Sequence, residues 1–86
     1  MADVVIYTTD YCGYCRAAKR LLEARNIPYE EIDVTGDDEK RRWLRETTGR
    51  HTVPQIFIRG EPIGGYTDLA RLDEEGRLQE MLAGEL

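Results

Sequence analysis

The sequence holds two cysteines, Cys12 and Cys15, with only Gly13 and Tyr14 between them. A cysteine pair at this spacing beside a strand–helix–strand pattern is typical of redox-active dithiols. A short β-branched run precedes the pair at residues 4–8 and an amphipathic helical pattern follows it, so Cys12 is expected at the start of a helix. The free N–H groups and the positive dipole at a helix start favour a thiolate. We therefore expect Cys12 to attack disulfides and to leave them readily, with Cys15 close enough to form a small disulfide.

Three other uses of two cysteines are open to this chain. A structural zinc ion needs four ligands, and the sequence offers two thiols and one histidine, His51. A permanent disulfide is typical of small secreted domains, which usually carry several bridges rather than one. Two inert, buried thiols would also fit the count, but Gly13 and Tyr14 at a loop–helix junction favour exposure of Cys12. Disulfide exchange is therefore the leading interpretation.

The composition places the cysteine pair in a small globular protein. The chain has 86 residues, of which 41% are hydrophobic and 34% charged, and we expect a single domain over residues 1–86. A net charge of −5 disfavours nucleic acid as a partner. No apolar run approaches the roughly 20 residues that span a bilayer, and no basic and apolar leader is visible. We therefore expect a cytoplasmic protein with no membrane partner.

Hydrophobic patterning predicts an α/β fold in the order β-α-β-α-β-β-α, with a further short helix after it. Strands are expected at residues 4–8, 29–34, 55–59 and 63–65, and helices at 15–25, 39–48, 67–75 and 78–82. Asn26 and Gly49 stand where helices are expected to end, and Thr67 or Asp68 could cap the third helix. The first crossover should give a parallel strand pair and the last two strands a hairpin, which makes a four-stranded mixed sheet flanked by helices.

Three motifs, taken together and in order, resemble those of a known family. Residues 11–15 (YCGYC), 52–58 (TVPQIFI) and 63–69 (IGGYTDL) are similar to the motifs of dithiol glutaredoxins, and the resemblance extends over essentially the whole chain. It implies a thioredoxin fold and catalysis of glutathione-dependent thiol–disulfide exchange. Glutathione and disulfide-bonded or glutathionylated proteins are then the implied partners.

The resemblance also implies roles for individual residues. In the family the first cysteine is the nucleophile and the second resolves, which gives these roles to Cys12 and Cys15. Beside the resemblance, we expect Tyr14 to shield the sulfurs and offer its hydroxyl, with a purely packing role as the alternative. The implied glutathione-binding residues are Thr52, Val53, Pro54, Gly65, Thr67 and Asp68. The family's proline is cis, and the residue before it pairs its backbone with the cysteine of glutathione. The helix start and the Asp68 carboxylate would hold the γ-glutamyl end.

Two positions depart from the family's pattern. Many dithiol members have proline after the first cysteine, and Gly13 stands there, as in members that hold a [2Fe–2S] cluster between two protomers with glutathione. A dimeric cluster carrier with Cys12 as ligand is therefore the second hypothesis; otherwise we expect a monomer that binds no metal. Many members also have a lysine that contacts the glycine carboxylate of glutathione where this chain has Thr9, and Arg41 is the candidate replacement.

The leading hypothesis is an enzyme that reduces protein disulfides and glutathione mixed disulfides. In a monothiol route Cys12 takes up glutathione from a protein and a second glutathione removes it. In a dithiol route Cys15 displaces the protein from Cys12 and glutathione reduces the resulting pair. A third hypothesis, recharging by thioredoxin reductase, is disfavoured because such redoxins lack the glutathione signature that Gly64, Gly65 and Asp68 retain.

Overall fold

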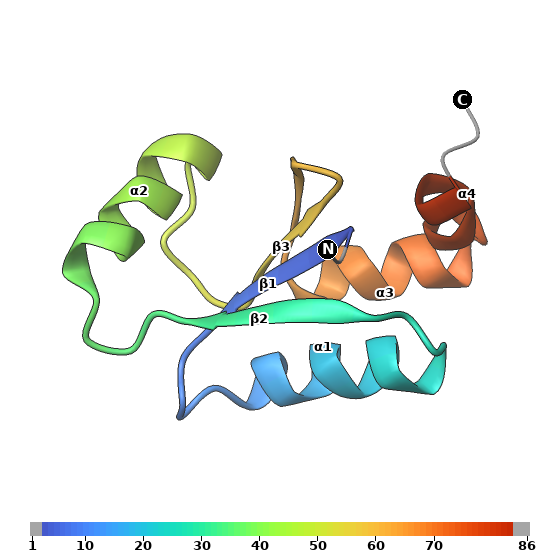
Figure 1. Cartoon of the computed structure of the whole chain (residues 1–86), viewed down its shortest axis with the longest axis horizontal. Helices are drawn as coiled ribbons and strands as arrows, with labels where there is room; N and C mark the ends of the chain where they lie inside the picture. Colours follow the sequence, from blue (N-terminus) through green and yellow to red (C-terminus); the bar gives the residue numbers. More distant parts are fainter. Residues whose placement is uncertain (1–2, 84–86) are drawn as a thin grey trace.

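The computed structural model describes residues 3–83, so the predicted domain limits at residues 1 and 86 lie outside the described residues. The elements are β1 (Val4–Thr8), α1 (Gly13–Ala24), β2 (Tyr29–Asp33), α2 (Asp38–Thr48), β3 (Gln55–Ile58), β4 (Glu61–Gly64), α3 (Tyr66–Glu74) and α4 (Arg77–Ala83) (Figure 1). Their types and order agree with the prediction, including the short last helix. Within residues 3–83, none of the helices has the length and apolar character of a bilayer span.

The strands form one mixed sheet in the order β2-β1-β3-β4. β1 is parallel to β2 and antiparallel to β3, which in turn pairs antiparallel with β4. The predicted parallel crossover and hairpin are therefore confirmed. The two edges differ from the apolar centre, because β2 exposes Glu30, Glu31 and Asp33 while β4 contains an exposed proline, Pro62.

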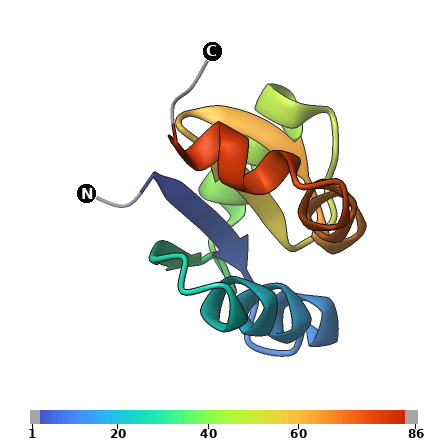
Figure 2. The ribbon, with the colours of Figure 1, turned by 90° about the vertical axis from the view of Figure 1, so that its right-hand side faces the viewer.

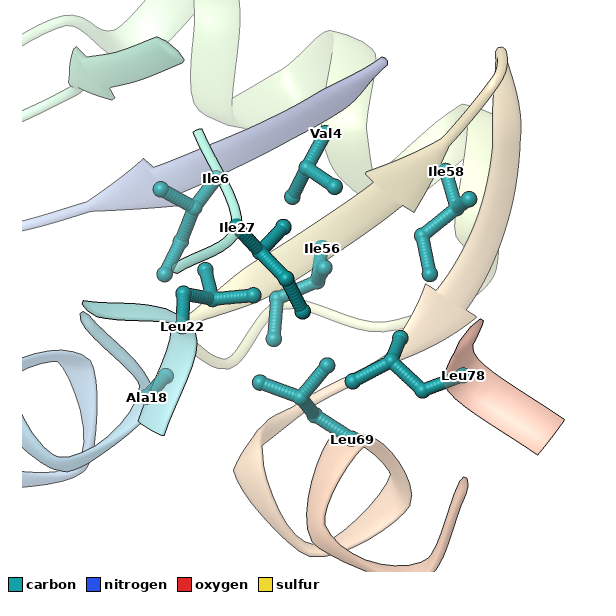
Figure 3. Packing of buried hydrophobic residues seen from close by; sticks show 9 residues of the cluster. All are labelled: Val4, Ile6, Ala18, Leu22, Ile27, Ile56, Ile58, Leu69 and Leu78. Carbon is teal, nitrogen blue, oxygen red and sulfur yellow. The ribbon is translucent and has the colours of Figure 1, made fainter. Parts of the chain in front are cut away.

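Side chains alternate along the strands and build a core on each face of the sheet. On one face the buried residues are Val4, Ile6, Ala18, Leu22, Ile27, Ile56, Ile58, Leu69 and Leu78 (Figure 3). On the other face Tyr7 and Phe57 pack with Val34 and with Leu44 of α2. β1 thus lies between α1 and α2 (Figures 1 and 2). Because α1 and α3 are anchored on the same face, both can contribute to one site.

The ends of α1 and α2 follow the sequence signals. Cys12 is the N-cap of α1, as predicted for a residue just before the first turn. Asn26 adopts a left-handed conformation with φ 57° immediately after the end of α1. In α2 the Asp37 carboxylate accepts a hydrogen bond from the N–H of Lys40, and Gly49 ends the helix with φ 76°.

The start of α3 differs from the prediction that Thr67 or Asp68 caps it. The helix begins at Tyr66 with Gly65 as its N-cap, so both predicted caps lie in the first turn. The physical reason is that the Asp68 carboxylate reaches back and accepts a hydrogen bond from the N–H of Gly65, over 3.0 Å. An acidic side chain three residues after the N-cap satisfies a free N–H in the same way as in a capping box.

Candidate active site

Cys12 places its sulfur at the open first turn of α1. The N–H of Cys15 donates a hydrogen bond to this sulfur, with 3.1 Å between N and Sγ. The Cys12 thiol in turn donates to the carbonyl oxygen of Val53, 3.5 Å away in the loop before β3. Cys12 is only half-buried, so its sulfur is held by two backbone contacts and is still accessible.

Cys15 has a different environment, although both cysteines are free thiols. Its side chain is 1% exposed. Burial, followed by the hydrogen bond with the Cys12 side chain, raises the pKa of the Cys15 thiol to about 12, although the backbone of Thr9 and the charge of Lys19 act in the opposite direction. Cys15 therefore stays protonated while the sulfur of Cys12 is accessible. The two thiols therefore differ in accessibility, with Cys12 half-buried and Cys15 buried.

A groove of about 210 Å³ opens beside the dithiol, between the start of α1, the loop before β3 and the start of α3. Its lining residues are Tyr14, Arg50, Thr52, Val53, Pro54, Gly65, Tyr66, Thr67 and Asp68. The fold thus brings Tyr14 and the predicted residues of the second and third motifs together at one surface. The groove adjoins Cys12, because Val53, which lines it, accepts the hydrogen bond of that thiol.

Two contacts shape the walls of this groove. The exposed ring of Tyr14 stacks on Tyr66, with ring centroids 6.1 Å apart, and so connects the start of α1 to the start of α3. Pro54 is buried, and its peptide bond with Val53 is cis, as the resemblance implies. A Cβ atom at Gly65 would lie 3.3 Å from the carbonyl oxygen of Pro54, so the start of α3 lies directly against the loop.

Asp68 holds a defined carboxylate at the end of the groove. Its Oδ2 accepts hydrogen bonds from the N–H of Gly65 and, over 3.1 Å, from Nη1 of Arg50. The Gly65 hydrogen bond and, less strongly, the Arg50 guanidinium lower the pKa of Asp68, while partial burial opposes them. Gly64 makes this arrangement possible, because a Cβ atom there would collide with the Asp68 carboxylate and the backbone has φ +117°. The first glycine of the pair therefore leaves space for Asp68.

Three residues need separate comment: the predicted contact Arg41, Thr9 in the position of the family's lysine, and Arg50, which was not predicted. Arg41 does not line the groove; its Nη2 lies 3.4 Å from the carbonyl oxygen of His51. Thr9, which stands where many family members have a lysine, is buried, and its hydroxyl has no hydrogen-bond partner among the described residues. Arg50, which does line the groove, was missed because a single arginine in a loop gives no periodic or motif signal.

The described residues do not contain a ready-made metal centre. Within residues 3–83, no group of three His, Cys, Asp or Glu side chains could hold a metal ion.

The mixed sheet with helices on both faces and a dithiol at the start of its first helix define a thiol oxidoreductase of the thioredoxin fold. A family model described as glutaredoxin matches residues 4–63. The chain belongs to the glutaredoxin family.

Individual relatives agree with this assignment. The chain is 44% identical over 82 residues to glutaredoxin 3 of Escherichia coli (strain K12), covering 95% of this chain and 99% of that protein. The holo form of glutaredoxin C1 from Populus tremula x tremuloides matches with a TM-score of 0.90 at 31% identity, over 96% of this chain and 85% of that one. A buckwheat glutaredoxin–glutathione complex matches with a TM-score of 0.88 at 30% identity, over 95% of this chain and 77% of that one.

Proposed function

We propose that this chain is a cytoplasmic, glutathione-dependent oxidoreductase that reduces protein disulfides and protein–glutathione mixed disulfides. The observation that carries the proposal is the groove beside Cys12, whose lining combines the half-buried loop residue Val53 with a carboxylate at Asp68. A tripeptide with one thiol and a charged γ-glutamyl end matches these features. A buckwheat relative with the same fold forms a complex with glutathione, which supports this choice of co-substrate.

In the monothiol route, the Cys12 thiolate attacks the glutathionyl sulfur of a protein mixed disulfide. The bond between Cys12 and glutathione forms, the bond to the protein sulfur breaks, and the protein thiolate leaves and takes a proton from water. The thiolate of a second glutathione then attacks the glutathionyl sulfur on Cys12. Oxidised glutathione forms and Cys12 leaves as a thiolate, stabilised by the N–H of Cys15.

In the dithiol route, Cys12 attacks a protein disulfide and forms a mixed disulfide with the protein. Cys15 then loses its proton, attacks the Cys12 sulfur and releases the protein as a second thiol. Because burial raises the pKa of Cys15 to about 12, this proton must leave as the attack takes place. Two glutathiones subsequently reduce the Cys12–Cys15 disulfide and are themselves oxidised to glutathione disulfide.

The bound glutathione would extend along the groove from Cys12. Its cysteine would pair with the backbone of Val53, between Thr52 and Pro54, in the manner of an added strand. Its γ-glutamyl end would lie at the start of α3, where Gly65, Thr67 and Asp68 are located. Tyr14 would cover the sulfurs from the other wall. Arg41 remains the proposed contact for the glycine carboxylate, since its guanidinium lies against the loop that leads into Thr52.

The test is glutathione-dependent reduction of a small mixed disulfide, coupled to glutathione reductase and NADPH. The wild-type chain should turn over, and Cys12→Ser should reduce the rate to that of the uncatalysed reaction. Replacing glutathione and its reductase with thioredoxin reductase should give little turnover. Equal rates for the wild type and Cys12→Ser, or turnover only with thioredoxin reductase, would contradict the proposal.

A second candidate function is transport of a [2Fe–2S] cluster as cargo of a dimer that shares Cys12 and glutathione. It is favoured by Gly13, because a Cβ atom built there would meet no heavy atom within 4 Å apart from its chain neighbours and the backbone of its own helix, which leaves the surface beside Cys12 open. Anaerobic purification with and without glutathione should give a coloured dimer for the wild type and a colourless protein for Cys12→Ser. A wild-type chain that stays a colourless monomer in both preparations would exclude this function.

A further inference from the structure

The backbone of Arg50 is held by hydrogen bonds, although its side chain, which lines the groove, is exposed. Its N–H donates to the hydroxyl of Thr48 over 3.1 Å, and its carbonyl oxygen accepts from the buried side-chain amide of Gln55 over 2.8 Å. Gln55 is itself 4% exposed and belongs to β3. The backbone of Arg50 is therefore anchored to α2 and to the sheet, which limits where its guanidinium can reach.

The guanidinium lies beside the Asp68 carboxylate, with 3.1 Å between Nη1 and Oδ2. Both side chains line the same groove that adjoins Cys12. They are partly exposed, at 55% for Arg50 and 31% for Asp68, and an exposed ion pair of this kind contributes little to stability. A ligand that brings a partner for each charge can therefore separate the pair at small cost.

We propose that Arg50 is a specificity-determining residue, which binds the α-carboxylate of the γ-glutamyl end of glutathione while Asp68 binds its α-amino group. This inference rests on the proposed function. The α-carbon of a γ-glutamyl group carries an ammonium and a carboxylate side by side, and the Arg50–Asp68 pair presents the opposite charges side by side. The carboxylate of the ligand then takes the place of Asp68 beside Arg50, and the ammonium of the ligand takes the place of Arg50 beside Asp68. Both residues therefore keep a counterion.

The chemistry of the two side chains fits this division. A guanidinium has five N–H donors in a planar fork that matches a carboxylate, and Arg50 directs only Nη1 at Asp68. Asp68 is held by the N–H of Gly65, so it keeps its position when Arg50 turns toward the ligand. The acidic and basic residues thus act as separate subsites for the two charged groups of one amino acid.

The test measures formation of the Cys12 mixed disulfide in a Cys15→Ser background. Protein is equilibrated with a tripeptide thiol and its disulfide, and mass spectrometry gives the fraction of modified protein. Three peptides are compared: glutathione, γ-aminobutyryl-Cys-Gly, which lacks the α-carboxylate, and glutaryl-Cys-Gly, which lacks the α-amino group. Arg45→Gln, on the exposed surface of α2, is the control for removal of one positive charge.

Arg50→Gln should lower the equilibrium constant for glutathione by about three- to tenfold and leave that for γ-aminobutyryl-Cys-Gly unchanged. Asp68→Asn should weaken glutathione similarly and spare glutaryl-Cys-Gly. Arg50→Lys, which keeps the charge, should recover part of the loss, and Arg45→Gln should leave all three constants unchanged.

The outcomes separate this inference from the proposed function. If Arg50→Gln weakens glutathione and γ-aminobutyryl-Cys-Gly equally, or weakens neither, the role of Arg50 is overturned while the function stands. If the Cys15→Ser chain forms no mixed disulfide with glutathione at all, the proposed function fails and the inference fails with it. Unfolding midpoints in urea for each variant show whether a uniform loss reflects a damaged fold.

Discussion

The N–H of Cys15 donates a hydrogen bond to the sulfur of Cys12 over 3.1 Å. Cys15 therefore contacts Cys12 through its backbone amide, while its own thiol is buried beside that sulfur. A change of the side chain leaves the amide in place. The roles of the amide and the thiol can thus be separated by a single substitution.

Cys15→Ser should retain reduction of small glutathione mixed disulfides within about threefold, because the amide that supports Cys12 remains. It should abolish reduction of protein disulfides that require the second thiol. Both activities are measured in the glutathione reductase coupled assay, with Cys12→Ser as the control that loses both. Loss or survival of both activities in Cys15→Ser would contradict the assigned roles.

The buried Cys15 thiol should react slowly with iodoacetamide in the folded protein. A thiol with a pKa of about 12 is ionised to roughly one part in 10⁴ at pH 8, whereas a cysteine thiol of an unfolded chain, near ~8.5, is about a quarter ionised. In Cys12→Ser, burial still raises the pKa of Cys15, so alkylation followed by mass spectrometry should stay slow at pH 8 and accelerate as pH rises toward 12. Denaturant should restore ordinary reactivity. Rapid labelling of the folded variant at pH 8 would show that Cys15 is not protected.

Two neighbouring threonines should respond in opposite directions to removal of the hydroxyl. Thr8 is buried and donates to the Glu31 carboxylate over 2.7 Å, whereas the buried Thr9 hydroxyl has no partner among residues 3–83. Thr8→Val should lower the free energy of unfolding by about 1–3 kcal/mol, because a hydrogen bond to a charged group is lost. Thr9→Val should leave it unchanged or raise it by about 1 kcal/mol, because an unsatisfied polar group is removed. Urea unfolding of the two variants provides the comparison, and a similar loss in both would contradict it.

Gly64→Ala should be more harmful than replacement of another glycine with positive φ. Gly36 has φ +74° and open space around it, so Gly36→Ala measures the backbone cost alone, about 1–2 kcal/mol. Gly64→Ala adds a collision with the Asp68 carboxylate, and its free energy of unfolding should fall by at least about 1 kcal/mol more. Its affinity for glutathione should also fall, because Asp68 is displaced. Equal effects in both variants would show that Asp68 has room to move.

Much of the fold could be predicted because its signals are local. The β-branched runs, the helical stripe after Cys15 and the stop signals at Asn26 and Gly49 act over a few residues, and each appears where expected. The start of α3 could not be predicted in the same way. Its N-cap is a glycine without a side chain, and the capping group comes from Asp68, three residues into the helix.

The site was predictable only in part, because some of its contacts form only when the chain is folded. Resemblance to known motifs identified the residues that line the groove from the loop before β3 and from the start of α3. Arg50 shows what motifs leave out. It is one of several arginines in this part of the chain, and the hydrogen bond of its carbonyl oxygen with the Gln55 side chain helps to place its guanidinium beside Asp68.

The edges of the sheet have a consequence for the behaviour of the protein at high concentration. A second molecule that docked alongside β2 would bring Glu30, Glu31 and Asp33 against the same carboxylates of its own. On the opposite side Pro62 lacks the N–H that an incoming strand would need. Both edges therefore disfavour the addition of a strand from a second molecule, while the half-buried Cys12 sulfur lies away from them at the start of α1.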